Sequence, residues 1–275
     1  MKLGFVLPNN WGLADPAPIV DLAVAAEDLG FDSVWVNHHV INIGYIAERL
    51  GDRSYHDALT VLTWVAARTS RVEVGTSVLV MPYLHPMVLA KTLATLDQLS
   101  GGRVIAGLGV GSLPEENEVL GVDYGNRGRL SNEFIQVMQA LWAPGPASFS
   151  GDHFSMDEVV AAPKPVREPL PVWIGGSGGP AMARAARFGE GWHPMCSVGG
   201  LARRMPQLEA ALAQRGRDRS DIVVAPRIDA TQVPDAEALD AWREAGADQL
   251  IIGTGTADLG EIRQALDRLA GLVGA

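Results

Sequence analysis

The chain has 275 residues, 47% of them hydrophobic, which is close to the roughly 250 residues of a (β/α)8 barrel and enough to bury a large core. Its formal net charge is −10, so a long-range field repels nucleic acid and anionic membranes, and an anionic ligand needs local donors. Cys196 is the only cysteine, which excludes an intramolecular disulfide, and the sequence has no signal-peptide core or transmembrane stretch. We therefore predict a cytoplasmic protein with no nucleic-acid or membrane partner.

The first hundred residues alternate between apolar runs and helical patterns. Leu3–Leu7 is a short strand that Pro8 stops. Asp15 and Pro16 then begin a helix, whose apolar residues recur at helical spacing until Gly30. The alternation continues with strands at Ser33–Val36 and Val72–Val80, a polar loop at Asn37–Tyr55, and helices at Asp57–Thr69 and from Pro86 to Gly101.

Three predicted strands end in small residues. Val104–Ala106 runs directly into the alternating glycines of Gly107–Gly111, and the stretches Gly75–Pro82 and Pro171–Pro180 have the same design. Glycine has no Cβ, so a strand that ends in glycines lets another molecule approach its backbone. We therefore expect these three strand ends to share one cleft at the C-terminal edge of a parallel sheet.

The second half of the chain resumes the alternation after a longer interval. A helix near Leu130–Trp142 is followed by a segment rich in Pro and Gly, in which Phe149–Met156 alternates apolar and polar residues as in a β-hairpin. Four further strands are predicted at Val172–Gly175, Gly191–Met195, Ile222–Ile228 and Gln249–Ile252, with helices between them and a last helix from Asp258.

Eight strands that alternate with helices predict an α/β fold with a parallel sheet covered by helices. At this length a sheet of eight strands most naturally closes, so we predict a (β/α)8 TIM barrel over residues 1–275 as a single domain. The hairpin is then an insertion between the fourth and fifth strand regions. The alternative is an open doubly wound sheet, but its glycine fingerprint belongs in the first strand–helix turn, where Pro8–Asp15 contains only Gly12.

The turn GGSGG is the strongest candidate for an anion site. Its residues precede a predicted helix, so free N–H groups and a positive helix end would point at a ligand, although a flexible loop is the alternative. The run GLGVG fits only half of a dinucleotide fingerprint, because Ser112 and Leu113 follow it. Arg127 and Arg129 begin a helix and are candidates to hold a phosphate or simply to be solvated. The turn consists of Gly175, Gly176, Ser177, Gly178 and Gly179.

Other chemistries have weaker support. His38 and His39 follow a strand, and adjacent side chains on an extended segment point to opposite sides, so at most one faces the cleft. We expect no metal, since His193 has no HxH or carboxylate cluster to join. A Schiff-base lysine near a strand end and a G-x-S-x-G hydrolase elbow are both missing from the sequence. Among the tryptophans, Trp11 and Trp192 are the ones we would place in a cleft against a planar ring.

A collinear set of motifs resembles the luciferase-like monooxygenase superfamily, and most closely its branch of oxidoreductases that depend on the deazaflavin coenzyme F420. The resemblance is clearest from Met1 to Trp192 and weaker beyond it. The motifs are GTSVLV at Gly75–Val80, His85-Pro86, LDQLSGGR at Leu96–Arg103, GLGVG at Gly107–Gly111, Ala140–Trp142, APKP at Ala162–Pro165 and PVWIGG at Pro171–Gly176.

The resemblance implies a (β/α)8 barrel with an insertion, a homodimer, and F420 or FMN at the C-terminal mouth. The cofactor ring would lean on a bulge with a non-prolyl cis peptide at Ser77-Val78. The phosphate would meet the backbone of Gly175–Gly179 and of Val110-Gly111. His39 corresponds to a histidine that usually follows an aspartate, although His38 stands in that place here.

The resemblance also bears on the substrate. Relatives that oxidise sugar phosphates have a glutamate directly after the glycines, where this chain has Ser112, so that class is disfavoured. We predict an oxidoreductase that transfers a hydride between F420 and a small organic substrate. His39 is the catalytic candidate, which would donate a proton or a hydrogen bond, and His38 is the next candidate. The alternatives are an FMN-dependent monooxygenase that uses reduced flavin and oxygen, and a flavin- or deazaflavin-binding protein without turnover.

Overall fold

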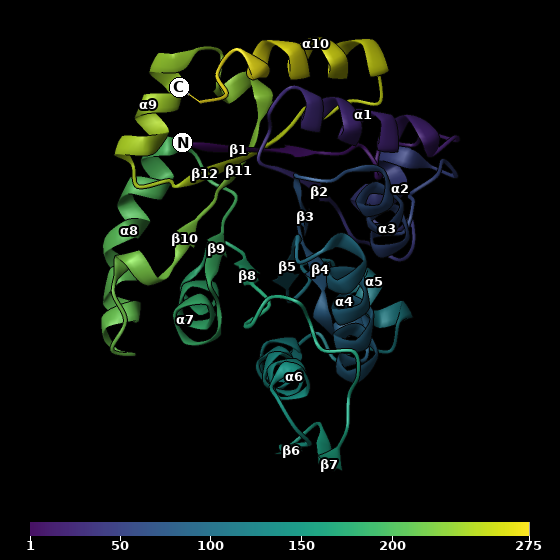
Figure 1. The fold of residues 1–275 in the computed structure, drawn as a ribbon, viewed down its shortest axis with the longest axis vertical. Coiled ribbons are helices and arrows are strands. Elements are labelled where there is room, and N and C mark those ends of the chain that lie inside the picture. The colour runs from purple at the N-terminus through teal and green to yellow at the C-terminus, as the bar shows by residue number, and fades with distance from the viewer. Residues whose placement is uncertain (275) are drawn as a thin grey trace.

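Eight strand positions join edge to edge in parallel and form a closed barrel in the computed structural model, which describes residues 1–274 (Figure 1). The last strand pairs back onto the first, with Gln249 opposite Lys2, so the sheet closes as predicted. The barrel strands are β1 (Lys2–Val6), β2 (Ser33–Val36), β3 with β4 (Glu73–Thr76 and Leu79–Val80), β5 (Val104–Gly109), β8 (Val172–Gly175), β9 (Gly191–His193), β10 with β11 (Val223–Val224 and Arg227–Asp229) and β12 (Gln249–Gly253).

Two of the predicted strands are interrupted. The stretch Ile222–Ile228 divides into β10 and β11 at Pro226, which has no N–H to donate to a neighbouring strand. The barrel stays closed there, because the N–H of Arg227 donates to Pro194 O (2.8 Å). The stretch Val72–Val80 divides into β3 and β4, and the peptide bond of Ser77-Val78 between them is cis, as the resemblance implied.

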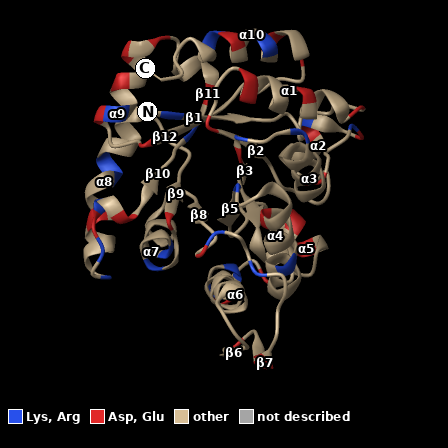
Figure 2. Cartoon of the chain, in the orientation of Figure 1, with Lys and Arg blue, Asp and Glu red and all other residues tan. Residues whose placement is uncertain are grey.

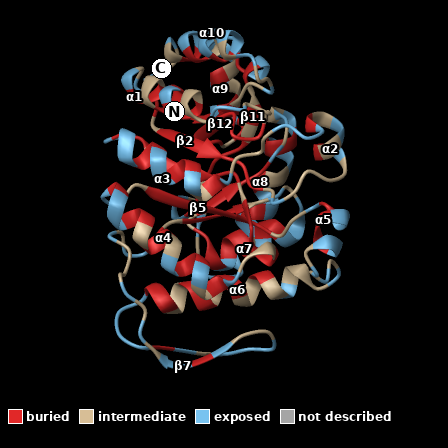
Figure 3. Ribbon diagram, turned by 90° about the vertical axis from the view of Figure 1, so that its right-hand side faces the viewer, coloured by how far each residue is buried: buried red, intermediate tan, exposed pale blue. Residues whose placement is uncertain are grey.

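Helices connect the strands and cover the outside of the barrel (Figure 3). Their buried residues face the strands, while their exposed residues form the outer surface. Two short helices, α2 and α5, lie in segments after β2 and β5 that the sequence did not predict as helical. The helices are α1 (Ala17–Asp28), α2 (Tyr45–Leu50), α3 (Ala58–Arg68), α4 (Pro86–Ser100), α5 (Pro114–Val119), α6 (Arg127–Trp142), α7 (Gly179–Phe188), α8 (Val198–Ala213), α9 (Ala236–Glu244) and α10 (Leu259–Ala270).

Capping residues set several helix ends. Asp57 accepts a hydrogen bond from Thr60 N (2.8 Å) at the start of α3. Asp258 accepts one from Glu261 N (2.9 Å) at the start of α10. These bonds satisfy N–H groups that have no partner within the helix. At the other end of α4, Gly101 adopts φ +70°, the left-handed conformation that ends a helix most easily with glycine.

The predicted insertion forms the antiparallel hairpin β6 (Ala147–Ser150) and β7 (Ser155–Val159), which lies beyond α6 (Figure 1). Glu133 on α6 holds its turn, because its carboxylate accepts hydrogen bonds from Asp152 N (3.1 Å) and His153 N (2.8 Å). The hairpin contributes no strand to the barrel.

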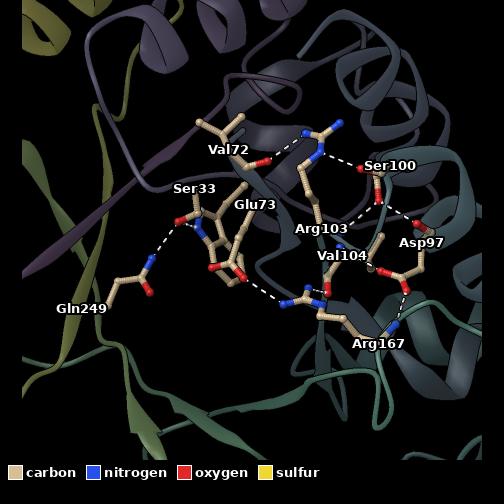
Figure 4. Close-up of polar contacts among 10 residues, drawn as sticks. Ser33, Val72, Glu73, Asp97, Ser100, Arg103, Val104, Arg167 and Gln249 are labelled. Carbon is tan, nitrogen blue, oxygen red and sulfur yellow. Dashed lines mark hydrogen bonds and ion pairs between the residues drawn. The ribbon is translucent and has the colours of Figure 1, made fainter. Parts of the chain in front are cut away.

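Two groups of polar contacts lie toward the amino ends of the barrel strands (Figure 4). Ser33 Oγ accepts from Trp35 Nε1 (2.8 Å) and Gln249 Nε2 (2.6 Å). The fully buried Asp97 accepts from the backbone N–H of Val104 (3.2 Å) and Val166 (2.8 Å). The LDQLSGGR motif, to which Asp97 belongs, is therefore structural and lies away from the C-terminal mouth.

Charged side chains lie largely on the outer helices and loops, and the barrel strands carry few of them (Figure 2). Within residues 1–274, no helix combines the length and the apolar character needed to cross a membrane.

Candidate functional site

A cavity of about 440 Å³ lies at the carboxyl ends of the barrel strands. This volume is in the range of small-molecule sites, roughly 300–1,000 Å³. The three glycine-rich strand ends share it, as the sequence predicted. Of the predicted site residues, the cavity is lined by His39, Ser77, Val78, Val110, Gly111, Gly175, Gly176 and Ser177.

Three predicted cofactor contacts do not line this cavity. Trp192 was expected in a cleft against a ring, but its side chain is fully buried and its Nε1 donates to Gly176 O (2.8 Å). That prediction is wrong, because the alternation of β9 turns Trp192 away from the mouth and its neighbour His193 toward it. Gly178 and Gly179 lie beyond the cavity wall, at the start of α7.

The turn before α7 nevertheless offers donors at the edge of the cavity. Gly176 has φ +111°, a conformation that favours glycine, and its N–H donates to His193 O (3.3 Å). Among residues 1–274, the N–H groups of Ser177, Gly178 and Gly179 have no hydrogen-bond acceptor. Together with the positive end of the helix dipole, these groups suit a phosphate.

The glycines at the strand ends also leave room for other residues of the chain. A Cβ on Gly107 would lie 1.7 Å from Thr76 O, and one on Gly109 would lie 2.5 Å from a methyl of Val78. A Cβ on Gly175 would lie 2.9 Å from the other methyl of Val78. These three glycines therefore make room for the bend between β3 and β4, and the approach of an outside ligand is not what requires them.

Ser77 and His193 form a fixed pair on the cavity wall. Ser77 Oγ lies 2.8 Å from His193 Nε2, and His193 Nδ1 lies 2.5 Å from Ala225 O. Because a carbonyl only accepts, Nδ1 carries the proton and Nε2 accepts from the Ser77 hydroxyl. Burial lowers the pKa of His193 to about 4, so the imidazole is neutral at pH 7.

The two adjacent histidines both line the cavity, but they have different roles. His38 is buried, and its Nδ1 accepts from Val80 N (3.1 Å), which ties the end of β4 to the segment after β2. Burial lowers the pKa of His38 to about 4. The sequence argument that at most one of the two faces the cleft is therefore wrong, because both histidines line the cavity.

His39 is held by a carboxylate from a distant part of the sequence. Its Nδ1 lies 2.5 Å from Glu116 Oε2, and its Nε2 lies 3.1 Å from the Tyr45 hydroxyl. Burial raises the pKa of Glu116, but hydrogen bonds from His39, Val40 N and Ile41 N outweigh this effect and leave the pKa lowered. Because an ionised carboxylate only accepts, Nδ1 carries a proton and Nε2 is the nitrogen left to accept one.

A second cavity, of about 330 Å³, adjoins the first. Both are lined by Met195 and Arg227, so they are neighbouring parts of one mouth. Trp11 lines this second cavity, and the guanidinium carbon of Arg49 lies 4.3 Å from the centre of its ring. Trp11 thus lines a cleft, and its contact with a planar ring stays a prediction.

Comparison with known proteins identifies the family. The sequence model described as luciferase-like monooxygenase matches residues 1–271. The chain belongs to the luciferase-like monooxygenase family. This match confirms the resemblance that the sequence motifs indicated.

Two family relatives and one solved structure illustrate the range of likeness. An F420-dependent glucose-6-phosphate dehydrogenase of Kineococcus radiotolerans is 34% identical over 218 residues, which cover 75% of this chain and 61% of that protein. An uncharacterized protein of Mycobacterium tuberculosis is 31% identical over 283 residues, which cover 98% of each chain. The structure of an F420-dependent secondary alcohol dehydrogenase in complex with an F420–acetone adduct superposes with a TM-score of 0.83 at 21% identity, over 98% of this chain and 97% of that one.

These comparisons support different conclusions. The likeness to the solved structure, at 21% identity, shows only that the barrel fold is shared. The chain spans less than two thirds of the length of the dehydrogenase relative, so the activity in that relative's name is not carried over directly.

The sequence analysis did not predict several residues that line the mouth of the barrel. Arg227 lies near the end of a predicted strand, which is the signal that identified the glycine turns. His193 was considered only as a metal ligand. Tyr55 lies in the polar loop after β2, where no spacing distinguishes it. Glu116 lies on the short helix α5, with 76 residues separating it from His39, and no local pattern predicts their contact.

Proposed function

We propose that the chain is an oxidoreductase that transfers a hydride between coenzyme F420 and a small organic substrate. The observation that carries the proposal is the contact of His39 with Glu116 at a cavity whose edge holds the unpaired N–H groups before α7. The relatives named as F420-dependent support the choice of cofactor. When bound, the deazaflavin supplies the hydride chemistry.

The chain's own residues then bind, orient and move a proton. The N–H groups of Ser177, Gly178 and Gly179 hold the phosphate. Val78, fixed between Gly109 and Gly175, gives one wall against which a flat ring packs. His39 exchanges a proton with the substrate through Nε2, while Glu116 holds the imidazole in one orientation. The substrate named for the dehydrogenase relatives is disfavoured, because the family resemblance places a glutamate where this chain has Ser112.

The binding step is tested by two matched variants of the helix start. Gly178 has φ −91° and ψ 166°, where Asp and Asn are both good N-caps, and an added Cβ would meet only Pro180 at an ordinary 3.7 Å. Gly178→Asp adds a negative charge beside the phosphate and should weaken F420 binding about tenfold or more, since charges 4 Å apart repel by about 4 kcal/mol at a dielectric constant of 20. Gly178→Asn is the neutral control. Equal F420 affinity of the two variants in fluorescence titrations would move the phosphate elsewhere.

The choice of cofactor is tested by titrating the purified protein with F420 and with FMN. Tighter F420 binding supports the proposal. Micromolar FMN binding without F420 binding would reverse it in favour of an FMN-dependent monooxygenase. Exposure of the reduced complex to oxygen separates the same two chemistries, because reduced FMN reacts quickly and a reduced deazaflavin hardly reacts.

Catalysis is tested at His39. General acid–base help is worth about 10²–10⁴-fold, so His39→Ala should lower turnover by this factor and change F420 affinity much less. Unchanged turnover would show that His39 has a structural role and takes no part in catalysis. We further propose that the protein is a homodimer and that it is located in the cytoplasm. Light scattering of the purified protein tests the oligomeric state.

A further inference from the structure

Two arginines at the mouth of the barrel have no carboxylate partner among residues 1–274. Arg49 on α2 and Arg227 on β11 line the cavity, and neither takes part in an ion pair recorded among residues 1–274. No Asp or Glu is among the lining residues described for this cavity. In a chain with a net charge of −10, two cations without a counter-charge at one cavity need an explanation.

Arg227 is anchored at one side of its guanidinium group only. Its Nη1 donates to Asn37 Oδ1 and to Ser77 O (3.2 Å). Its Nε and Nη2 have no hydrogen-bond partner within the described part of the chain. The Nε–Nη2 edge is a planar fork that matches the two oxygens of a carboxylate or phosphate. Asp229 lies nearby on the second cavity, but its Oδ1 accepts from Thr231 N (2.9 Å) and it makes no ion pair with Arg227.

Two further donors at this side of the cavity lack acceptors. Arg49 donates through Nη2 to Asn10 O (3.1 Å), whereas its buried Nε has no hydrogen-bond partner in the part of the chain that the structure describes. The Tyr55 hydroxyl is also buried without a partner. Burial raises the pKa of Tyr55, so this hydroxyl is protonated at neutral pH and can donate. Buried donors without acceptors are rare in proteins and point to a group that is bound when the site is in use.

We propose that Arg227, Arg49 and Tyr55 form an anion subsite, and that the substrate is an organic anion that carries a carboxylate or a phosphate group. The proposal rests on the proposed function, and it names the substrate class of the same site. The subsite lies at β11 and α2, whereas the cofactor phosphate is assigned to the turn between β8 and α7. Val80 and Met195 add apolar surface for the rest of the substrate.

The shape of the mouth supports a small substrate. Arg227 lies on the wall shared by the cavities of about 440 and 330 Å³. An anion held there leaves its organic part to extend into the larger cavity, which His39 also lines. The substrate would then be tethered through its charge on one side and meet the proton-exchanging nitrogen on the other.

The first titrations measure binding of simple probes to the purified protein without cofactor, so their outcome does not depend on F420 binding. The same titrations are then repeated with saturating F420. The probes are benzoate, phenyl phosphate and the neutral benzyl alcohol, titrated by calorimetry. We expect at least one anion to bind about tenfold or more tightly than benzyl alcohol, and this preference to disappear in Arg227→Gln. The benzoate to phenyl phosphate ratio distinguishes the two kinds of anion. Arg263→Gln on the exposed face of α10 removes the same charge and should bind as the wild type does.

Three results would overturn the proposal. One is equal affinity for the anions and benzyl alcohol. Another is unchanged anion binding in Arg227→Gln, or in Arg49→Gln if the first variant does not fold by its thermal melt. The third is loss of anion binding when F420 is saturating, which would assign both arginines to the cofactor. Failure of F420 to bind at all would contradict the proposed function and leave the anion titrations valid.

Discussion

Replacement of Glu116 by Gln tests how this protein controls the protons of His39. The fully buried carboxylate accepts from His39 Nδ1 (2.5 Å) with one oxygen and from Val40 N (2.7 Å) and Ile41 N (3.3 Å) with the other. In Glu116→Gln, the amide oxygen must stay with the two backbone donors. The amide NH2 group then faces Nδ1, which has to accept, so the imidazole proton moves to Nε2. The substitution therefore inverts the tautomer of His39 with almost no change of shape.

The expected magnitude follows from this inversion. An imidazole that already carries its proton on Nε2 cannot accept one there, so turnover should fall by about 10²-fold or more, within the range that acid–base groups contribute. The free energy of unfolding should fall by about 1.5–3 kcal/mol, since one charge-assisted hydrogen bond is lost. Cofactor affinity should change little, because Glu116 does not line the cavity.

The assay combines kinetics with a direct view of the imidazole. Values of kcat and KM are compared with the ¹⁵N chemical shifts of His39, which distinguish the two tautomers without any turnover. Glu118→Gln, an exposed position on the same helix, is the matched control and should behave as the wild type does. A Glu116→Gln protein that keeps the Nδ1–H tautomer, or one that inverts it and still turns over normally, would refute the reasoning.

Three further predictions concern stability. The folded-state pKa values of His38 and His193 are about 4 against 6.5 for the free side chain, so the unfolded chain takes up protons first and the free energy of unfolding should fall as pH drops from 6.5 to 4, by about 1.4 kcal/mol per pH unit for each histidine. Urea titrations at several pH values measure this slope, and a flat profile would contradict it. Gly107→Ala should destabilise the barrel by about 3 kcal/mol or more in a thermal melt, because its Cβ would lie 1.7 Å from Thr76 O, whereas Gly179→Ala has no heavy atom within 4 Å of its Cβ and should be nearly neutral. Asp97→Ala should cost roughly 3–5 kcal/mol in urea unfolding, since it leaves several backbone donors without an acceptor, and a loss below 1 kcal/mol would show that water replaces the carboxylate.

The barrel was predictable because its signals are local. The strand of Leu3–Leu7 and the helix between Asp15 and Gly30 are each specified by neighbouring residues, and the number of such units indicates closure. The break of the seventh strand at Pro226 also had a local signal, the missing N–H, which a continuous apolar run concealed. Short helices such as α5 (Pro114–Val119) have too few residues to show a period, and packing decides them.

The site was predictable only where it follows from strand ends. Ser77, Gly111 and Ser177 meet at one cavity because parallel strands present their carboxyl ends together. The partners of His39 follow no such rule, since a contact with Glu116 depends on how the loop after β2 and the helix after β5 fold over the mouth. Trp192 shows the opposite error, because a residue at a strand end faces either the mouth or the surrounding helices, and sequence position does not decide which.

The glycines at the ends of β5 and β8 indicated the correct place for a different physical reason. Gly109 and Gly175 were taken to let a ligand approach, yet each leaves space for one methyl group of Val78. Side chains at those positions would force Val78 and the segment between β3 and β4 out of the mouth. These two glycines therefore shape the cavity only indirectly. They leave room for Val78, and Val78 forms part of the cavity wall. The N–H groups at Ser177–Gly179, which have no acceptor among residues 1–274, remain available to contact a phosphate directly. The charge variants of Gly178 therefore probe the cofactor, while a substitution at Gly109 probes the cavity wall.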